Sequence, residues 1–243
     1  MILAANWKLH FGPKETHNYL KEFLQLASQV TEDVQFIFFP PALCLPQTAE
    51  ILKTTKIKWG AQNTFFEDEG AFTGETSPKE VAHLGASYGL VGHSERRHFF
   101  KESNEWVIQK FHALIRHNLT PILCVGETLE QRNHGQTLQV IQEQIQFLSN
   151  KLPPFLIAYE PVWAIGTGQV ATPEQAQEVH QSIKSFLKEK GISDIPVLYG
   201  GSVKSANAPA LFSQKDVDGF LVGGASLKPQ SFFDIYQSVK DML

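Results

Sequence analysis

Short apolar segments alternate with longer amphipathic segments along the whole chain. Several of the short segments lack a regular alternation of apolar and polar residues, which is typical of strands that are buried on both faces of a parallel sheet. The expected strands cover residues 2–5, 34–39, 57–61, 88–91, 121–125, 155–159, 195–199 and 219–222. The pattern therefore predicts a parallel β-sheet.

The longer segments carry apolar residues at the spacing of amphipathic helices. The apolar faces are formed by Tyr19, Leu20, Phe23, Leu24, Ala27 and Val30, by Trp106, Val107, Phe111, Leu114 and Ile115, and by Leu138, Ile141, Ile145 and Leu148. Two helix starts are also marked, because Ser77 and Thr172 are each followed by proline and, three residues after the hydroxyl, by Glu80 or Gln175. A hydroxyl cap, an early proline and a third-position acid or amide are typical of a helix N-terminus.

Eight strands alternating with about eight helices in 243 residues are typical of the (β/α)8 barrel. An open, doubly wound sheet is the alternative, because alternation by itself does not close a sheet. No linker or break in composition divides the chain, so we expect one α/β domain over residues 1–243. In both folds the ligands bind at the carboxyl ends of the strands.

Charge and composition argue against several classes of function. A formal net charge of −4 argues against electrostatic binding of nucleic acid by the protein as a whole, because such binding needs a basic patch. The apolar stretch 36–39 is far too short to cross a bilayer, and residues 1–8 are expected to form a first strand rather than a signal peptide. Two cysteines, Cys44 and Cys124, exclude a disulfide scaffold and a four-cysteine zinc site, and they suit a reducing cytoplasm.

Chemically active side chains directly follow the predicted strands. Asn6 and Lys8 follow the first strand, His93 follows the fourth, and Glu160 follows the sixth. Glycine-rich turns follow the last two strands, at 200–202 and 223–226. In a barrel these residues would surround one cavity with a cation, an imidazole, a carboxylate and turns able to hold an anion.

Each of these residue types suits a step of proton transfer beside a carbonyl. Glu160 ends an apolar strand before a loop bounded by proline and glycine, which favours a general base that moves a proton between adjacent carbons. His93 begins a predicted helix, whose N-terminus disfavours imidazolium, so we expect a neutral ring that donates to substrate oxygens. Lys8 is expected to offset phosphate or enediolate charge, with Asn6 hydrogen-bonding beside it.

Six segments, in order along the chain, resemble the triosephosphate isomerase family. They are NWK at 6–8, GAFTGE at 70–75, GHSERR at 92–97, AYEPVWAIGTG at 158–168, YGGSV at 199–203 and GFLVGGASL at 219–227. The resemblance implies a single TIM barrel that interconverts dihydroxyacetone phosphate and D-glyceraldehyde 3-phosphate through an enediolate, in glycolysis and gluconeogenesis. It implies a phosphorylated triose as substrate and neither a cofactor nor a metal.

The resemblance assigns further residues to the site. Those that match the phosphate-binding turns of the family are Gly166, Ser202, Gly223 and Gly224, and glycine N–H groups do approach anions closely. Glu95 matches a residue that orients Lys8. Ile165 and Leu221 match apolar residues that close over Glu160 and are expected to raise its pKa.

The stretch 161–167 is expected to be a lid, with proline at one end, glycine at the other and apolar residues between them. It overlaps a second motif, because residues 166–171 match the G-x-G-x-x-A dinucleotide fingerprint. A true fingerprint turns directly from a strand into a helix, whereas several residues intervene here. The lid is therefore the better interpretation.

The resemblance also implies a homodimer through the loop around Thr73, in the cytoplasm, with no nucleic-acid or membrane partner. Phe65 and Phe66 in this loop are expected to reach the partner or to support the loop. One departure from the family is Lys184, which stands where an arginine usually pairs with an acid at Asp216. Lysine cannot reproduce a bidentate arginine contact, so the rigidity beside the eighth loop is in doubt.

Four other functions compete with the isomerase. Another sugar-phosphate enzyme could use the same fold, because its phosphate site is widely reused. A metal-dependent epimerase would bring several His and Asp ligands to the strand ends, where this chain has one His, and His93 and His98 lack the H-E-x-x-H spacing. An NAD-dependent oxidoreductase would require that residues 166–171 bind a dinucleotide. A catalytically inactive barrel that serves as a binding module is disfavoured by the full set of polar residues at the strand ends.

Overall fold

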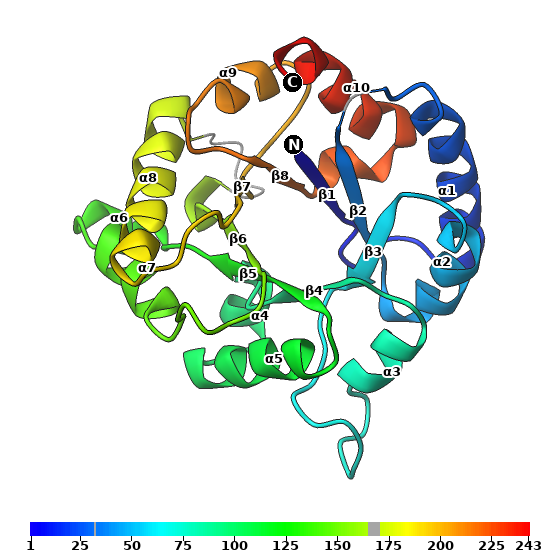
Figure 1. Ribbon diagram of the computed structural model, residues 1–243, viewed down its shortest axis with the longest axis horizontal. Helices are drawn as coiled ribbons and strands as arrows, with labels where there is room; N and C mark the ends of the chain where they lie inside the picture. The colour runs from blue at the N-terminus through cyan, green and yellow to red at the C-terminus, as the bar shows by residue number, and fades with distance from the viewer. Residues whose placement is uncertain (32, 165–170) are drawn as a thin grey trace.

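The strands form one closed parallel barrel, which Figure 1 shows at the centre of a ring of helices. The computed structural model describes residues 1–31, 33–164 and 171–243. The strands are β1 (Ile2–Asn6), β2 (Gln35–Phe39), β3 (Lys58–Ala61), β4 (Tyr88–Val91), β5 (Thr120–Val125), β6 (Leu156–Tyr159), β7 (Val197–Tyr199) and β8 (Gly219–Val222). Each predicted strand is present, with its ends shifted by at most two residues.

Pairing of the first strand with the last distinguishes the barrel from an open sheet. Ile2 of β1 pairs with Gln35 of β2 on one side and with Gly219 of β8 on the other. A Cβ atom on Gly219 would lie 2.0 Å from the Ile2 carbonyl oxygen, so only glycine allows this approach. The (β/α)8 TIM barrel is confirmed, and the doubly wound alternative is wrong.

Helices cover the outside of the barrel. They are α1 (Pro13–Ala27), α2 (Leu45–Leu52), α3 (Pro78–His83), α4 (Ser94–Phe99), α5 (Asn104–Arg116), α6 (Leu129–Asn133), α7 (Thr137–Ile145), α8 (Pro173–Glu189), α9 (Ala208–Phe212) and α10 (Pro229–Val239). The 3₁₀ turns are η1 (Ala42–Cys44), η2 (Val162–Ala164), η3 (Gly224–Leu227) and η4 (Lys240–Met242). The count exceeds one helix per strand because two helices follow β4 and two follow β5.

Both marked helix starts have the expected caps. The Ser77 hydroxyl accepts a hydrogen bond from the Glu80 N–H, and Thr172 and Gln175 form a reciprocal capping box. These contacts satisfy N–H groups that have no partner within the helix. The local sequence therefore sets where α3 and α8 begin.

The departure at Lys184 leaves an intact polar cluster. The Lys184 ammonium lies 2.9 Å from Asp218 Oδ2 and 3.7 Å from Asp216 Oδ1. Gln177 supplies two contacts with Asp216 in place of the bidentate contact that an arginine would make. Its Nε2 lies 2.5 Å from Asp216 Oδ2, and its Oε1 accepts from the Asp216 N–H at 3.0 Å. A lysine and a glutamine together thus hold the segment before β8.

A buried histidine packs behind the strands that carry the site. His180 of α8 is fully buried, and its ring centroid lies 5.9 Å from that of Tyr159 and 6.3 Å from that of Tyr199, on β6 and β7. Its Nδ1 lies 3.1 Å from the Asp216 carbonyl oxygen, whereas Nε2 has no hydrogen-bond partner in the described part of the chain. Burial lowers the pKa of His180 to about 4.

We expect the free energy of unfolding to fall as pH falls from about 6.5 to about 4. In this range the unfolded chain protonates His180 while the folded chain keeps it neutral, which costs about 3 kcal/mol in total. When the free energy of unfolding is measured with urea across this pH range, it should depend less on pH in His180→Gln than in His83→Gln, a control at an exposed histidine. Equal slopes in the two variants would contradict this assignment.

Candidate active site

A cavity of about 710 Å³ opens at the carboxyl ends of the strands. The predicted residues that line it are Asn6, Lys8, His93, Glu160, Ser202, Leu221, Gly223 and Gly224. Glu95 joins this group through a contact with Lys8. Ile165 and Gly166 lie outside the described residues, which include only residues 161–164 of the expected lid.

Lys8 is held in an unusual backbone conformation directly after β1. Its φ angle is +52°, and its N–H donates to Asn6 Oδ1 at 3.0 Å. Gln62, which follows β3, donates from Nε2 to the Lys8 carbonyl oxygen and to the Phe39 carbonyl oxygen, both at 2.8 Å. The lysine side chain is paired with Glu95, whose Oε1 lies 2.6 Å from Nζ.

The sequence does not predict the role of Gln62. The only local feature that would indicate a site residue is its position directly after a strand, which many other residues share. Its two hydrogen bonds tie the ends of β1 and β2 together beside the cavity. Gln62 therefore positions Lys8.

His93 caps the helix α4 with its own ring. Its Nδ1 accepts a hydrogen bond from the Glu95 N–H at 3.2 Å, so that nitrogen carries no proton. The remaining ring nitrogen, Nε2, lies 2.9 Å from Glu160 Oε1 and donates to it. The helix start thus selects the tautomer whose Nε2–H faces the cavity.

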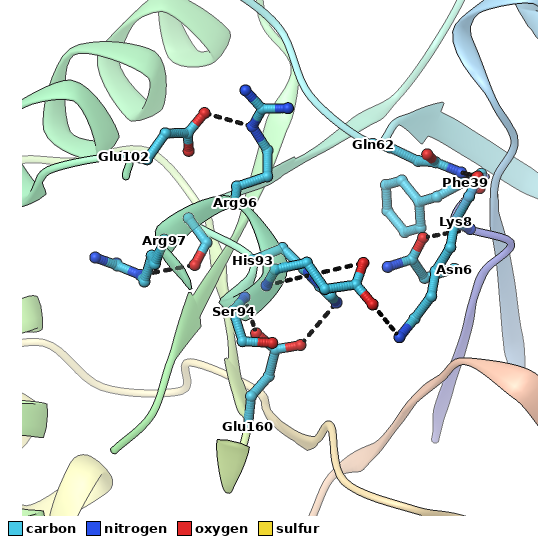
Figure 2. A network of polar contacts seen from close by, with 12 residues as sticks. Asn6, Lys8, Phe39, Gln62, His93, Ser94, Arg96, Arg97, Glu102 and Glu160 are labelled. Carbon is cyan, nitrogen blue, oxygen red and sulfur yellow. Dashed lines mark hydrogen bonds and ion pairs between the residues drawn. The ribbon is translucent and has the colours of Figure 1, made fainter. Parts of the chain in front are cut away.

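Glu160 is buried and makes polar contacts through both carboxylate oxygens. Oε1 accepts from His93, and Oε2 accepts from the Ser94 N–H at 2.8 Å (Figure 2). Both partners belong to the start of α4, although they are far from Glu160 in sequence. The carboxylate therefore lies against the imidazole and the first turn of this helix.

These contacts set the direction of the pKa shift of both groups. Burial raises the pKa of the Glu160 carboxyl, but His93, the Ser94 N–H and Lys8 outweigh it and lower that pKa in this arrangement. The rise expected when apolar residues close over Glu160 depends on Ile165, which lies outside the described residues. Burial lowers the pKa of His93, but Glu160 and then Glu95 raise it above its ordinary value. The Glu95 N–H at the helix start favours the neutral ring, whereas the two carboxylates, which the sequence analysis did not include, favour the charged one.

Two glycine turns form the other end of the cavity. A Cβ atom on Gly201 would lie 2.3 Å from the Tyr199 hydroxyl oxygen, and one on Gly223 would lie 3.2 Å from Lys8 Cε. After Gly223 the chain turns into η3, where the Ser226 hydroxyl donates to the Gly223 carbonyl oxygen at 2.7 Å. The Gly223 turn thus lies close to Lys8, and glycine turns of this kind allow backbone N–H groups to approach an anion.

Glu127 organises the chain on the outer side of β6. One of its oxygens, Oε1, accepts hydrogen bonds from Trp163 Nε1 at 2.9 Å, from the Tyr159 hydroxyl at 3.1 Å and from Arg132 Nη1 at 3.2 Å. Trp163 belongs to η2, immediately after Glu160 and before residues 165–170. Glu127 follows β5 closely in the chain, and no local sequence signal predicts this role.

The described residues form neither a metal-ligand cluster nor a membrane-spanning helix. Across residues 1–31, 33–164 and 171–243 no group of three or more His, Cys, Asp or Glu side chains is arranged to hold a metal ion. His98 is exposed on α4, whereas His93 contacts Glu160. Among the described helices none has the length and hydropathy of a membrane span.

Known proteins match nearly the whole chain. The family model described as triosephosphate isomerase matches residues 1–239. A protein named triosephosphate isomerase from Bdellovibrio bacteriovorus is 49% identical over 237 residues, covering 96% of this chain and 98% of its own length. Proteins with the same name from Legionella pneumophila strain Paris and Fusobacterium nucleatum are 44% and 43% identical, each covering 98% of both chains.

Proposed function

The chain belongs to the triosephosphate isomerase family and is an intramolecular aldose–ketose isomerase, and we propose that Glu160, His93 and Lys8 carry out its chemistry. The reaction interconverts dihydroxyacetone phosphate and D-glyceraldehyde 3-phosphate in glycolysis and gluconeogenesis. The observation that carries the assignment of residues is the convergence of Glu160, His93 and Lys8 on one cavity. Cofactor and metal have no part in the proposed steps.

Glu160 is the proposed base. Its carboxylate takes a proton from the carbon beside the substrate carbonyl and returns it to the adjacent carbon, which requires one group that reaches both. The single Nε2–H of His93 cannot donate to Glu160 and to substrate oxygens at once. Productive binding therefore exchanges the His93–Glu160 hydrogen bond for one from His93 to the substrate, which releases the carboxylate towards carbon.

His93 and Lys8 stabilise the charge that this proton transfer creates. The enediolate oxygens would accept from His93 Nε2, while the Lys8 ammonium offsets their negative charge. Glu95 and Gln62 keep Lys8 directed to the cavity. Asn6 lines the same wall, within reach of a small substrate held there.

The phosphate group belongs at the glycine turns. Gly223, Gly224 and Ser202 line the cavity around Lys8, and backbone N–H groups at the start of η3 suit a dianion. Gly166 is included on the sequence alone, together with Ile165 as an apolar cover. Leu221, at the end of β8, supplies an apolar wall to the same cavity.

The test of this function is isomerisation by the purified chain in the presence of a chelator. Turnover that persists supports the proposed acid–base route and excludes the metal-dependent epimerase and the inactive barrel. Equilibrium dialysis against NADH checks the oxidoreductase, which requires binding of the nucleotide. Loss of all turnover on chelation would contradict the proposed chemistry.

A homodimer is the proposed assembly, formed through the loop around Thr73. Thr73 is exposed, and its neighbour Phe72 is 42% exposed. At the C-terminal end of α4, Phe99 and Phe100 are 69% and 67% exposed. Large exposed aromatic side chains favour a partner surface. Phe65 is only 6% exposed and stacks on Phe66 at 4.0 Å between ring centroids, so this pair supports the loop from within.

We expect Thr73→Arg to shift the dimer towards monomer and to lower activity at micromolar protein. A buried unpaired cation at the proposed interface is costly, so association should weaken about tenfold or more. Sedimentation velocity and turnover over a dilution series measure both effects. Thr54→Arg, at another exposed threonine, is the matched control, and identical sedimentation of the two variants would contradict the interface.

Organisation and location complete the proposal. We treat residues 1–243 as one domain, which is supported by closure of the barrel between β1 and β8. Cytoplasmic location is supported by two cysteines, Cys44 and Cys124, that are both free and buried. The net charge of −4 supports the absence of nucleic acid as a partner.

A further inference from the structure

A second cavity lies behind Glu160. Its volume is about 280 Å³, and its polar lining includes Ser94, Arg97, His98, Lys101, Thr128 and Gln131. We call it the rear cavity. Figure 2 shows Arg97 on the opposite side of His93 from Lys8, so this guanidinium faces away from the main cavity.

Arg97 carries a charge without an acidic partner. Its Nε donates to the Gly92 carbonyl oxygen at 2.7 Å, Nη1 to Asn104 Oδ1 at 2.6 Å and Nη2 to the Cys124 carbonyl oxygen at 3.3 Å. All three acceptors are neutral, and in the described part of the chain no carboxylate forms an ion pair with Arg97. A guanidinium has five N–H donors, so this one keeps donor capacity beside a cavity.

Partial burial makes this charge significant. It lowers the pKa of Arg97, although the charges of Glu160 and Glu102 act in the opposite direction. Cations removed from water are normally paired with an anion. Neither acid pairs with Arg97 directly, because Glu102 is shared by Arg96 and Lys110 and the Glu160 oxygens are bound to His93 and the Ser94 N–H.

The rest of the lining favours an anion over a cation. Lys101 and His98 are exposed at α4 and the loop after it, and within the described residues neither forms an ion pair. Glu160 also borders the rear cavity, but its oxygens are bound to His93 and to the Ser94 N–H. Gln144 stiffens the wall through two hydrogen bonds with the Gly126 backbone, at 2.9 and 3.1 Å.

We propose that the rear cavity binds a small tetrahedral oxyanion of the size of inorganic phosphate. Arg97 is its main contact, because a guanidinium matches the geometry of two oxyanion oxygens. Lys101 adds a charge at the entrance. An occupant places a second negative charge beside Glu160 and so lowers kcat; this consequence, unlike the binding itself, rests on the proposed role of Glu160.

The direct test follows the Nε–H signal of Arg97 by nitrogen–proton NMR while inorganic phosphate is added. The main cavity is first saturated with glycerol 3-phosphate, a phosphate ester that lacks a carbonyl and cannot isomerise. The signal, identified by its absence from Arg97→Lys, should still shift and saturate. No shift once the main cavity is filled would overturn the proposal. This readout needs no turnover, so it stays valid if the assignment of Glu160 fails.

A variant that leaves Arg97 in place provides the second test. Lys101→Gln should weaken the phosphate response about two- to fivefold, because one partly exposed charge contributes little, whereas Lys188→Gln on α8 should match the unaltered protein. At saturating substrate, phosphate should still lower kcat in the unaltered protein and do so less in Lys101→Gln. Equal responses in the two lysine variants, or purely competitive inhibition, would contradict the rear cavity.

Discussion

Glu160→Gln lowers kcat by about 10²- to 10⁴-fold or more, with near-normal binding of phosphate-bearing analogues. The amide keeps the size of the side chain and can still accept from the Ser94 N–H, which donates to Glu160 Oε2 at 2.8 Å. It cannot take a proton from carbon. Steady-state turnover in both directions, together with titration of glycerol 3-phosphate, separates loss of the base from loss of the site.

Glu143→Gln is the matched control, since it makes the same change on an exposed residue of α7. It should keep full turnover. Unaltered turnover in Glu160→Gln, verified free of contaminating enzyme, would exclude Glu160 as the base. An equal loss in both variants would point to a general effect on folding.

Lys8→Met lowers kcat/KM by about 10²- to 10³-fold, the range found when one preorganised charge-stabilising donor is removed. Methionine preserves much of the apolar stem while it removes the ammonium. Both the phosphate and the developing enediolate lose their cation, so KM rises and kcat falls. Initial rates over a range of substrate concentrations resolve the two effects.

Folding should change little in this variant. The Lys8–Glu95 pair is 2.6 Å long but its side chains are 26% and 37% exposed, so its loss costs at most about 1 kcal/mol. Lys79→Met is the control, because it removes another lysine that lies 3.9 Å from an acid, Glu69, and that does not line the cavity. The midpoint of thermal unfolding should be similar for the two variants. If kcat/KM is also similar in the two, the proposed role of Lys8 is contradicted.

The sequence predicts elements and residue types more fully than it predicts contacts. Strand positions follow from unbroken apolar runs, and the starts of α3 and α8 follow from Ser77 and Thr172, because these signals act within a few residues. Placement of Asn6, Lys8, His93 and Glu160 at one rim follows once the strands are parallel. Their roles and those of the lid residues Ile165 and Gly166 stay predictions.

Contacts between distant segments needed the tertiary structure. Gln62 reaches Lys8 across 54 residues, and the buried Phe65 stacks on the partly buried Phe66. The position of the Arg97 guanidinium, which forms no ion pair within the described residues, is likewise invisible in the sequence, because its hydrogen-bond partners lie just after β4, in β5 and in α5. Local pattern contains no information about which side chains are left without a charged partner.

By itself, then, the sequence determined that this chain builds eight apolar strands with a base, an imidazole and a cation at their ends. Only the tertiary structure decided that β8 closes on β1 and that Glu160 lies against His93 and the Ser94 N–H, 66 residues away in the chain. The pKa of Glu160 is consequently lowered in this arrangement. The physical reason is that hydrophobic periodicity is a local property, whereas the charge state of a buried carboxyl depends on whichever groups folding brings beside it.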